Sequence, residues 1–514
     1  MTHLYRAWSS SIARLQSGAP KTGSLAADTA WNGGAQVVPQ IISLATVPIL
    51  LSHLGVDGYG VWALTNTLII FAVSLDGGMS SSAQRFFALY LSRGDAKHAS
   101  RLTTTLTAAA IGFAALLYVI GPALAQFILA IVRIPESIQP AAIVMFRNLG
   151  ILVLLMLLSN ILGGYLQAAQ RFRAIAISAV TANLTFLAGL LYAGDRLTIL
   201  RVFILSLMQI GVLNVMLAIN ARHFLRTTVS KFLPKQEVTE FYSYAWRTQI
   251  TNASALAILQ TDSIFVAILL PIDQLGYLAI GGQVATAVRS IPMFALAPLL
   301  SRLTRTFGGA GMKGVTKLAN LQNGRWVSAI AIYATVAVPA VAFAVRAWAG
   351  PYQLAELAAA VLTFGNCFNL LPGVASSYCR AIGRPGIEAR YSLVLVVGNM
   401  ALSWPCTYFW GLPGAVGSTA AVQLLACVYF YSVIHRKLPA FETGLSSIHW
   451  VRIAWIATLT LAFELGSTLL PSPSVLAFAA TAIAAIAVIW LAGMSALRDI
   501  RSALSDREAF EPDA

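Results

Sequence analysis

The strongest constraint on the fold is a series of long apolar stretches that recurs along almost the whole chain. Of the 514 residues, 58% are hydrophobic and only 10% are charged, whereas about a quarter of the residues of an average soluble domain are charged. Many of the stretches are long enough for an α-helix to cross the hydrocarbon core of a bilayer. The alternating polarity of an outer-membrane barrel is missing. The sequence therefore predicts an all-α polytopic membrane protein.

We expect about 14 transmembrane helices, each near the ~20 residues that a bilayer requires. Proline within several of them, such as Pro39, Pro122 and Pro292, predicts kinks, which neighbouring helices can accommodate. The expected helices are 29–52, 59–78, 103–131, 140–168, 174–193, 198–220, 246–270, 277–300, 325–349, 354–380, 390–410, 413–434, 450–470 and 474–496.

The net charge of +15 comes from basic residues in short segments between the apolar stretches. Such residues fix the topology of a membrane protein, so they give no support to nucleic-acid binding. With the N-terminus in the cytoplasm, the external segments hold few basic residues, and both termini are then expected to be cytoplasmic. The polar start of the chain lacks the pattern of a cleavable signal peptide. The external basic residues are essentially Arg133, Arg196, Arg201 and Arg346.

Two short motifs each occur twice in the chain. Gly58-Tyr59 returns as Gly276-Tyr277, and Ala168-x-x-Arg171 returns as Ala381-x-x-Arg384 after a similar interval. The repeats predict two six-helix lobes of the same orientation, an arrangement in which transporters bind substrate between the lobes. The expected parts are a cytoplasmic N-terminal segment 1–28, an N-lobe 29–222, a cytoplasmic linker 223–245, a C-lobe 246–437, a helical hairpin 438–497 and a cytoplasmic tail 498–514.

Arg289 is the charge that stands out, because it lies near the middle of the apolar span 277–300. Bringing such a charge to the centre of a bilayer costs at least ~2.5 kcal/mol, so it needs a partner or a wet cavity. Asp262 lies at a similar predicted depth in the preceding helix and is the natural partner. Two interpretations stay open: a static ion pair, or a cation that binds an anionic substrate while Asp262 tunes it.

Amide side chains mark a possible path for a polar substrate. Asn32, Gln36 and Gln40 follow one another at intervals of four residues, so they share one helix face. Amides can both donate to and accept from sugar hydroxyls, but they can equally bond to neighbouring helices. Arg147 either lines the path or extends outward to the interface. The other candidates for the path are Asn66 and Gln283.

Soluble-enzyme chemistry has no signature in this chain. The phosphate-binding pattern Gly-x-x-x-x-Gly-Lys-Ser/Thr and the metalloprotease pattern His-Glu-x-x-His are both missing. The four cysteines have neither the spacing of a metal site nor that of a disulfide framework. The sequence predicts a transporter rather than an enzyme, with no metal and no cofactor, and leaves coupling to a proton or sodium gradient open.

Two stretches resemble a known family. The segment 51–62, Leu-Ser-His-Leu-Gly-Val-Asp-Gly-Tyr-Gly-Val-Trp, is similar to the first external turn of polysaccharide flippases. The segment 75–85, which begins Leu-Asp-Gly-Gly and ends in Arg85, is similar to the inner end of helix 2 in the same family. The chain thus resembles the O-antigen and exopolysaccharide repeat-unit flippases of the multidrug/oligosaccharidyl-lipid/polysaccharide exporter superfamily.

That resemblance implies a lipid-linked oligosaccharide as substrate, carried on undecaprenyl diphosphate and flipped across the bacterial cytoplasmic (inner) membrane. It also implies membrane lipids and a polysaccharide polymerase or export complex as partners. A lipid II flippase and a cation-coupled drug antiporter of the same superfamily are the alternatives. A membrane glycosyltransferase or polymerase is a further one, although the short external loops speak against it.

Overall fold

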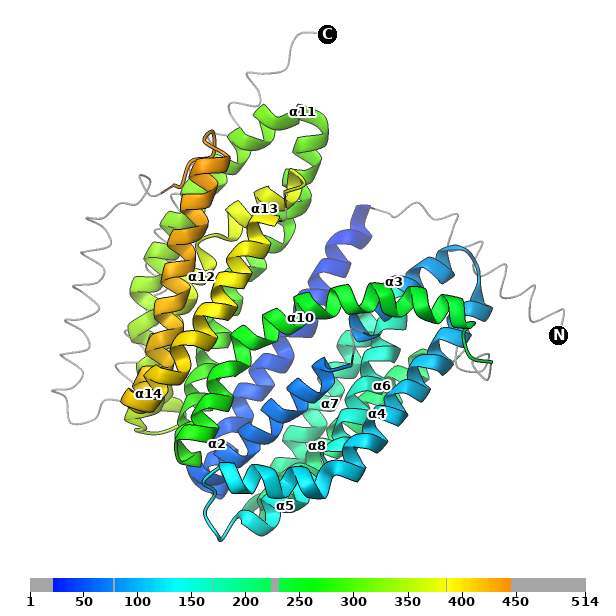
Figure 1. The fold of residues 1–514 in the computed structure, drawn as a ribbon, viewed down its shortest axis with the longest axis vertical. Coiled ribbons are helices and arrows are strands. Elements are labelled where there is room, and N and C mark those ends of the chain that lie inside the picture. The colour runs from blue at the N-terminus through cyan, green and yellow to red at the C-terminus, as the bar shows by residue number, and fades with distance from the viewer. Residues whose placement is uncertain (1–21, 77–78, 170, 223–230, 385, 445–514) are drawn as a thin grey trace. The chain divides into compact units, whose positions relative to one another are not determined.

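The computed structural model describes residues 22–76, 79–169, 171–222, 231–384 and 386–444, and over these residues the chain is helical almost throughout (Figure 1). The predicted fold class is thereby confirmed, whereas the predicted helices 450–470 and 474–496 lie outside the described residues. The elements are α2 (Thr22–Ser74), α3 (Met79–Ser92), α4 (Ala96–Ile131), α5 (Gln139–Arg147), α6 (Leu149–Ala168), α7 (Phe172–Ala193), η1 (Gly194–Arg196), α8 (Ile199–Asn220), α10 (Lys235–Leu269), α11 (Ile272–Trp348), α12 (Gln353–Leu370), α13 (Gly373–Ala381) and α14 (Gly386–Lys437).

Three pairs of predicted helices are continuous in the structure except for one kink each. The kinks lie at Gly55 in α2, Gly311 in α11 and Gly411 in α14, with φ of 67°, 66° and 63°. A residue with a Cβ rarely adopts these angles, so glycine allows the chain to change direction without a separate loop. The predicted pairs 29–52 with 59–78, 277–300 with 325–349, and 390–410 with 413–434 are therefore each one kinked element.

Other predicted boundaries were wrong in detail. The helix expected at 140–168 is interrupted at Asn148, whose side-chain amide donates to the carbonyl of Val144 at 2.7 Å and so competes with the helical ladder. The helix expected at 354–380 is interrupted before Pro372. Helix α3 was not predicted, and α10 begins at Lys235, within the segment predicted as a linker.

The chain divides into two compact units, Met1–Gly276 and Tyr277–Ala514. In the first unit α4, α6, α7 and α8 pack side by side, and α2 lies against α7 (Figure 1). The ring of Trp62 stacks on that of Phe186 at this α2–α7 contact, with centroids 6.4 Å apart. Helix α10 belongs to this unit as well, because it packs on α2 and α3.

In the second unit α12 packs along α14, and the two parts of α14 lie against each other. Their contact is polar and buried: the hydroxyl of Thr419 donates to the Oδ1 atom of Asn399 at 3.1 Å, and the hydroxyls of Ser403 and Ser418 are 3.1 Å apart. The kink at Gly411 therefore closes a helical hairpin whose two arms are joined by hydrogen bonds.

Positive-φ glycines recur at a constant spacing in the two units. Gly94 and Gly311, with φ of 68° and 66°, are separated by the same interval as Gly194 and Gly411, with φ of 45° and 63°. A left-handed turn is therefore placed at corresponding points of each unit, at nearly the same interval as the sequence motifs. This spacing is close to that of the two sequence motifs, and the internal repeat stays a prediction.

The chain is a multi-pass membrane protein. Eight helical segments among the described residues are long and apolar enough to cross a bilayer, and the longest of them, Gly386–Lys437, has 52 residues. Large apolar side chains such as Val119, Phe127 and Leu191 are exposed on these helices, as expected for surfaces that contact lipid. The total of 14 crossings stays a prediction.

Candidate substrate path

Arg289 lies on α11, within the second unit, and its guanidinium group is held by neutral partners. Its Nη2 atom donates to the Oδ1 atom of Asn369 on α12 at 2.9 Å. The amide nitrogen of Asn369 in turn donates to the hydroxyl of Tyr391 on α14 at 3.0 Å. The Nε atom of Arg289 is buried and has no hydrogen-bond partner among the described residues. Three helices thus contribute one residue each to a short polar chain that ends on a cation.

The backbone around this chain is fixed by two further side chains. The hydroxyl of Tyr333 donates to the carbonyl of Val288 at 2.8 Å, and the indole nitrogen of Trp326 donates to the carbonyl of Leu370 at 2.8 Å. These carbonyls belong to the residues next to Arg289 and Asn369. Trp326 and Tyr333 also pack against a small apolar cluster of Ile330, Cys367 and Leu370.

No carboxylate forms an ion pair with Arg289 in the second unit, as far as residues 277–384 and 386–444 are concerned. The ion pairs there are Arg346 with Glu356 and Arg380 with Glu388, both at the surface. A neutral amide satisfies one N–H of a guanidinium but leaves its charge uncompensated, and this cost grows in an apolar region. Within the second unit, as far as these residues are described, the guanidinium is thus bound by a neutral amide and not by a carboxylate.

Asp262 lies on α10 and belongs to the first unit, where its side chain is only 8% exposed. The pairing of Asp262 with Arg289 that we expected from the sequence joins two different units, and it stays a prediction. Arg147 lies at the C-terminal end of α5 and is exposed. Its exposure is compatible with both interpretations that the sequence left open.

The remaining path candidates lie on helices as expected. Gln40, Asn66 and Gln283 are each half-buried. Asn32 and Gln36 lie in the first part of α2, so the backbone places them on one face with Gln40, but their side chains lie outside the described residues. Gln283 shares helix α11 with Arg289, whereas the other four amides belong to the first unit.

Two further amides, Gln249 and Gln260, connect α10 to α2. The side chain of Gln249 on α10 donates to the carbonyl of Ser74 at the end of α2. The hydroxyl of Thr67 on α2 donates to Gln260 on α10 at 3.4 Å. These amides hold α10 against α2, which is the packing role that polar residues often have within membranes.

Asn369 and Tyr391 were missed by the sequence analysis, which considered the polar residues of the first, second, fourth, seventh and eighth helices only. The signal was present, because Asn366 and Asn369 interrupt the apolar stretch 354–380. A hydrogen-bonded contact with Arg289 could not be foreseen, since the three residues lie on three helices that are far apart in the chain.

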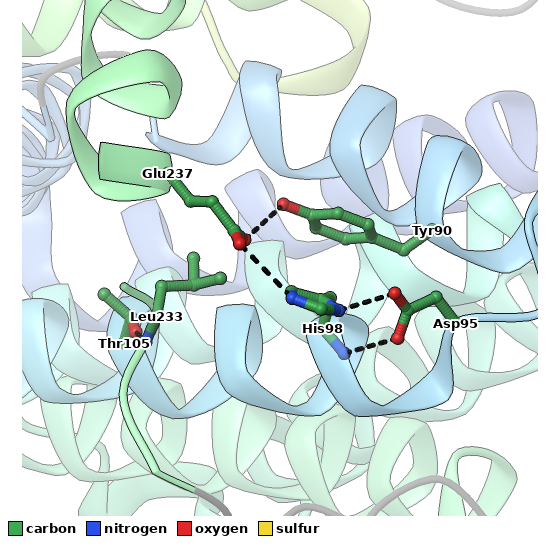
Figure 2. A network of polar contacts seen from close by, with 6 residues as sticks. All are labelled: Tyr90, Asp95, His98, Thr105, Leu233 and Glu237. Carbon is green, nitrogen blue, oxygen red and sulfur yellow. Dashed lines mark hydrogen bonds and ion pairs between the residues drawn. The ribbon is translucent and has the colours of Figure 1, made fainter. Parts of the chain in front are cut away.

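A second polar cluster connects the start of α10 to α3 and α4 (Figure 2). The imidazole of His98 lies between two carboxylates, with Nδ1 at 2.5 Å from Asp95 and Nε2 at 3.2 Å from Glu237. The hydroxyl of Tyr90 donates to the other oxygen of Glu237 at 3.3 Å, and the backbone N–H of Leu233 donates to Thr105 at 3.0 Å. The first turn of α10 is therefore tied to two other helices.

The charges of this cluster change how its members titrate. Partial burial raises the pKa of Asp95, but the hydrogen bonds and the charge of His98 outweigh it, so that the pKa lies below its usual value. Burial, together with Glu237, raises the pKa of Tyr90 to about 12. The Tyr90 hydroxyl thus stays protonated and able to donate throughout the neutral range.

The chain is similar to known proteins in sequence and in fold. Residues 25–304 match the family described as polysaccharide biosynthesis protein. The fold is similar to that of the lipid II flippase MurJ in an inward closed conformation, with 12% identity, a TM-score of 0.68 and coverage of 91% of this chain and 99% of that chain. It is also similar to an inward-facing multidrug resistance MATE family transporter of the MOP superfamily, with 12% identity, a TM-score of 0.59 and coverage of 83% and 99%. No curated protein matches the sequence.

Proposed function

Because the chain belongs to the polysaccharide biosynthesis protein family, we propose that it flips an undecaprenyl-diphosphate-linked oligosaccharide repeat unit across the bacterial cytoplasmic membrane by alternating access. The family agrees with the resemblance found at residues 51–62 and 75–85. The similarity to the flippase and multidrug transporter structures is one of fold, and it supports a transporter rather than an enzyme.

One observation carries the proposal: Arg289 is a cation within a predicted span, and among the described residues of its own unit it is bound by a neutral amide. A diphosphate is an anion that must pass through an apolar environment, so the protein has to offer it positive charge along the way. The guanidinium fork suits phosphate oxygens better than an ammonium group does. Arg289 would therefore contact the diphosphate during translocation.

The sugar and the polyprenyl tail of the proposed substrate also match the chemistry that the protein and the membrane offer. Half-buried amides such as Gln40, Asn66 and Gln283 can replace water around sugar hydroxyls, because each amide both donates and accepts. The polyprenyl tail is apolar and can remain among the lipids. In this proposal both termini are cytoplasmic, the sugar moves away from the cytoplasm, and a polysaccharide polymerase or export complex receives it.

Export of polysaccharide in a deletion strain tests the proposal. Arg289→Ala should abolish export although the protein still accumulates in the membrane, and Arg289→Lys should retain part of it, because lysine keeps the charge but loses the fork. Arg302→Ala is the matched control, since it removes an exposed positive charge from the same helix. Unchanged export by Arg289→Ala would refute the role of Arg289.

The amount of Arg289→Ala protein in the membrane has to be measured as well, because export is also lost when the protein does not accumulate. If Arg289→Ala fails only because the protein disappears, and if adding Asp262→Ala restores both level and export, then the two residues form a structural pair and the proposal is wrong about the site. The lipid that accumulates in the deletion strain gives an independent answer. A lipid-linked repeat unit supports the proposal, and lipid II would favour the flippase of cell-wall precursors.

A drug antiporter is the second candidate, and the buried carboxylate of Asp262 on α10 favours it. A cation-coupled pump needs an acidic group that can bind and release a cation within the membrane. Efflux of cationic dyes from cells that express the protein, and loss of this efflux in Asp262→Asn, would support that function. The flippase proposal expects no dye efflux by the native chain.

A further inference from the structure

We propose that Asn369 and Tyr391 are positioning residues that hold the guanidinium of Arg289 in the orientation required to bind the diphosphate; this inference rests on the proposed function. The contacts that carry it are the 2.9 Å bond from Arg289 to Asn369 and the 3.0 Å bond from Asn369 to Tyr391. They form an ordered relay in which only the first donor, Arg289, is charged.

The direction of the hydrogen bonds explains the choice of residue types. Arg289 can only donate, so its neighbour must accept with one atom, and Asn369 does so with its carbonyl oxygen. Asn369 then has an amide N–H to place, and the Tyr391 hydroxyl accepts it. An aspartate at position 369 would also accept from Arg289, but it would neutralise the charge. The amide thus fixes the cation and leaves its charge available.

Burial makes the relay rigid. Tyr391 is only 8% exposed, and its ring packs on that of Phe430 with centroids 5.1 Å apart. Asn369 lies next to Leu370, whose carbonyl accepts from Trp326. A flexible arginine loses rotamer entropy when it binds a ligand, and this loss grows with the freedom that the side chain had beforehand. A guanidinium already held in place avoids much of that loss.

The repeat indicates that the relay is a specialised feature rather than part of the common scaffold. The interval that separates Gly58 from Gly276 also separates Phe71 from Arg289, so Phe71 is the residue of the first repeat that corresponds to Arg289. The interval between Arg171 and Arg384 likewise pairs Met156 with Asn369 and Ser178 with Tyr391. The hydroxyl of Ser178 donates to a carbonyl of its own helix. The first repeat therefore has apolar side chains where the second has a cation and its amide.

The test measures binding of geranylgeranyl diphosphate to the purified full-length chain in nanodiscs, with geranylgeraniol as the uncharged comparison. We expect Asn369→Ala to weaken diphosphate binding roughly tenfold and Tyr391→Phe roughly threefold, with no change for the alcohol. Tyr378→Phe is the matched control, because it removes a buried hydroxyl of the same unit that contacts Thr316 and not the relay. It should bind both probes as the native chain does.

Asn369→Asp separates positioning from packing. It preserves the shape of the side chain and an acceptor for Arg289, so a purely structural role would be rescued. The inference expects this variant to have a melting temperature no lower than that of the native chain and to bind diphosphate roughly tenfold more weakly, because the carboxylate competes for the guanidinium. Diphosphate binding at the native level by Asn369→Asp would overturn the inference.

A double-mutant cycle keeps the inference distinct from the proposed function. In an Arg289→Ala background, Asn369→Ala should cause no additional loss of diphosphate affinity, since it acts through Arg289. If Arg289→Ala itself binds diphosphate normally, the role of Arg289 in the proposed function is refuted and the inference with it. If Arg289→Ala loses binding while Asn369→Ala and Tyr391→Phe bind normally or more tightly, only the inference is wrong.

Discussion

The backbone of Val56 lies so close to Gly276 that a Cβ atom on Gly276 would stand 2.6 Å from the Val56 carbonyl oxygen. Gly60 approaches the carbonyl of Ile272 in the same way. Gly58 and Gly276 are equivalent positions of the repeat, so corresponding turns of the two repeats cross here within the first unit. Glycine is required at this crossing because any side chain would displace the backbone of the other segment.

Gly276→Ala should therefore destabilise the protein. The overlap with backbone atoms costs about 1–3 kcal/mol, which exceeds the gain of up to about 1 kcal/mol from replacing a helical glycine by alanine. Thermal unfolding of the detergent-solubilised protein measures the effect. Gly282→Ala is the control, because its Cβ would meet only Leu362 at 3.9 Å. Equal melting temperatures for the two variants would contradict the close approach.

The hairpin of α14 should depend on Asn399. This side chain is 2% exposed, and its carbonyl oxygen accepts from both Thr419 and Ser403. Asn399→Ala leaves buried hydroxyls without their acceptor, so we expect a loss of about 1–2 kcal/mol in the free energy of unfolding. Ser432→Ala, on the exposed end of the same helix, should have no effect. Thr419→Val should cost less in the Asn399→Ala background than in the native chain, and simple additivity would speak against the hydrogen bond.

The first turns of α10 should unfold locally more often when the side chain of Glu237 is removed. Glu237→Ala loses contacts with both His98 and Tyr90, and such contacts at a half-exposed site contribute a few tenths to about 1 kcal/mol together. Hydrogen exchange of the first turns of α10 should then become up to about fivefold faster. Glu240→Ala is the matched control on the same helix, since Glu240 is exposed. Identical exchange in the two variants would show that the cluster does not hold α10.

The lowered pKa of Asp95 gives this cluster a pH dependence with a definite sign. A carboxyl whose pKa is depressed on folding stabilises the protein above its unfolded pKa, about 3.9. The contribution is lost as the pH falls through the lower folded value. The native chain should thus exceed Asp95→Asn in melting temperature by a constant amount above about pH 5, and the difference should shrink below about pH 4. A difference that grows on acidification would contradict the assignment.

Topology offers a test of the predicted orientation. Reporter fusions at Lys235 and Lys437 should give a cytoplasmic signal and a fusion at Gly350 an external one, because basic residues concentrate in the cytoplasmic segments. Alkaline phosphatase and fluorescent-protein reporters distinguish the two sides. An external signal at Lys235 would exclude a six-helix first lobe.

The sequence alone determined the class of the protein and the approximate position of most described helices. Apolar length and loop charge are local properties, because each helix must satisfy its own backbone in the bilayer. The polar residues within spans, above all Arg289, were equally visible. The kinks at Gly55, Gly311 and Gly411 were not, since a glycine in an apolar stretch fits a straight helix as well as a sharp turn.

Only the tertiary structure decided what the polar side chains contact. Gln249 and Gln260 were indistinguishable in the sequence from amides of a substrate path, and the fold uses both to attach α10 to α2. Asn369 and Tyr391 gained their significance from meeting Arg289 across three helices. A hydrogen bond depends on the rotation and register of each helix against its neighbours, and these follow from packing of the whole unit rather than from any one segment.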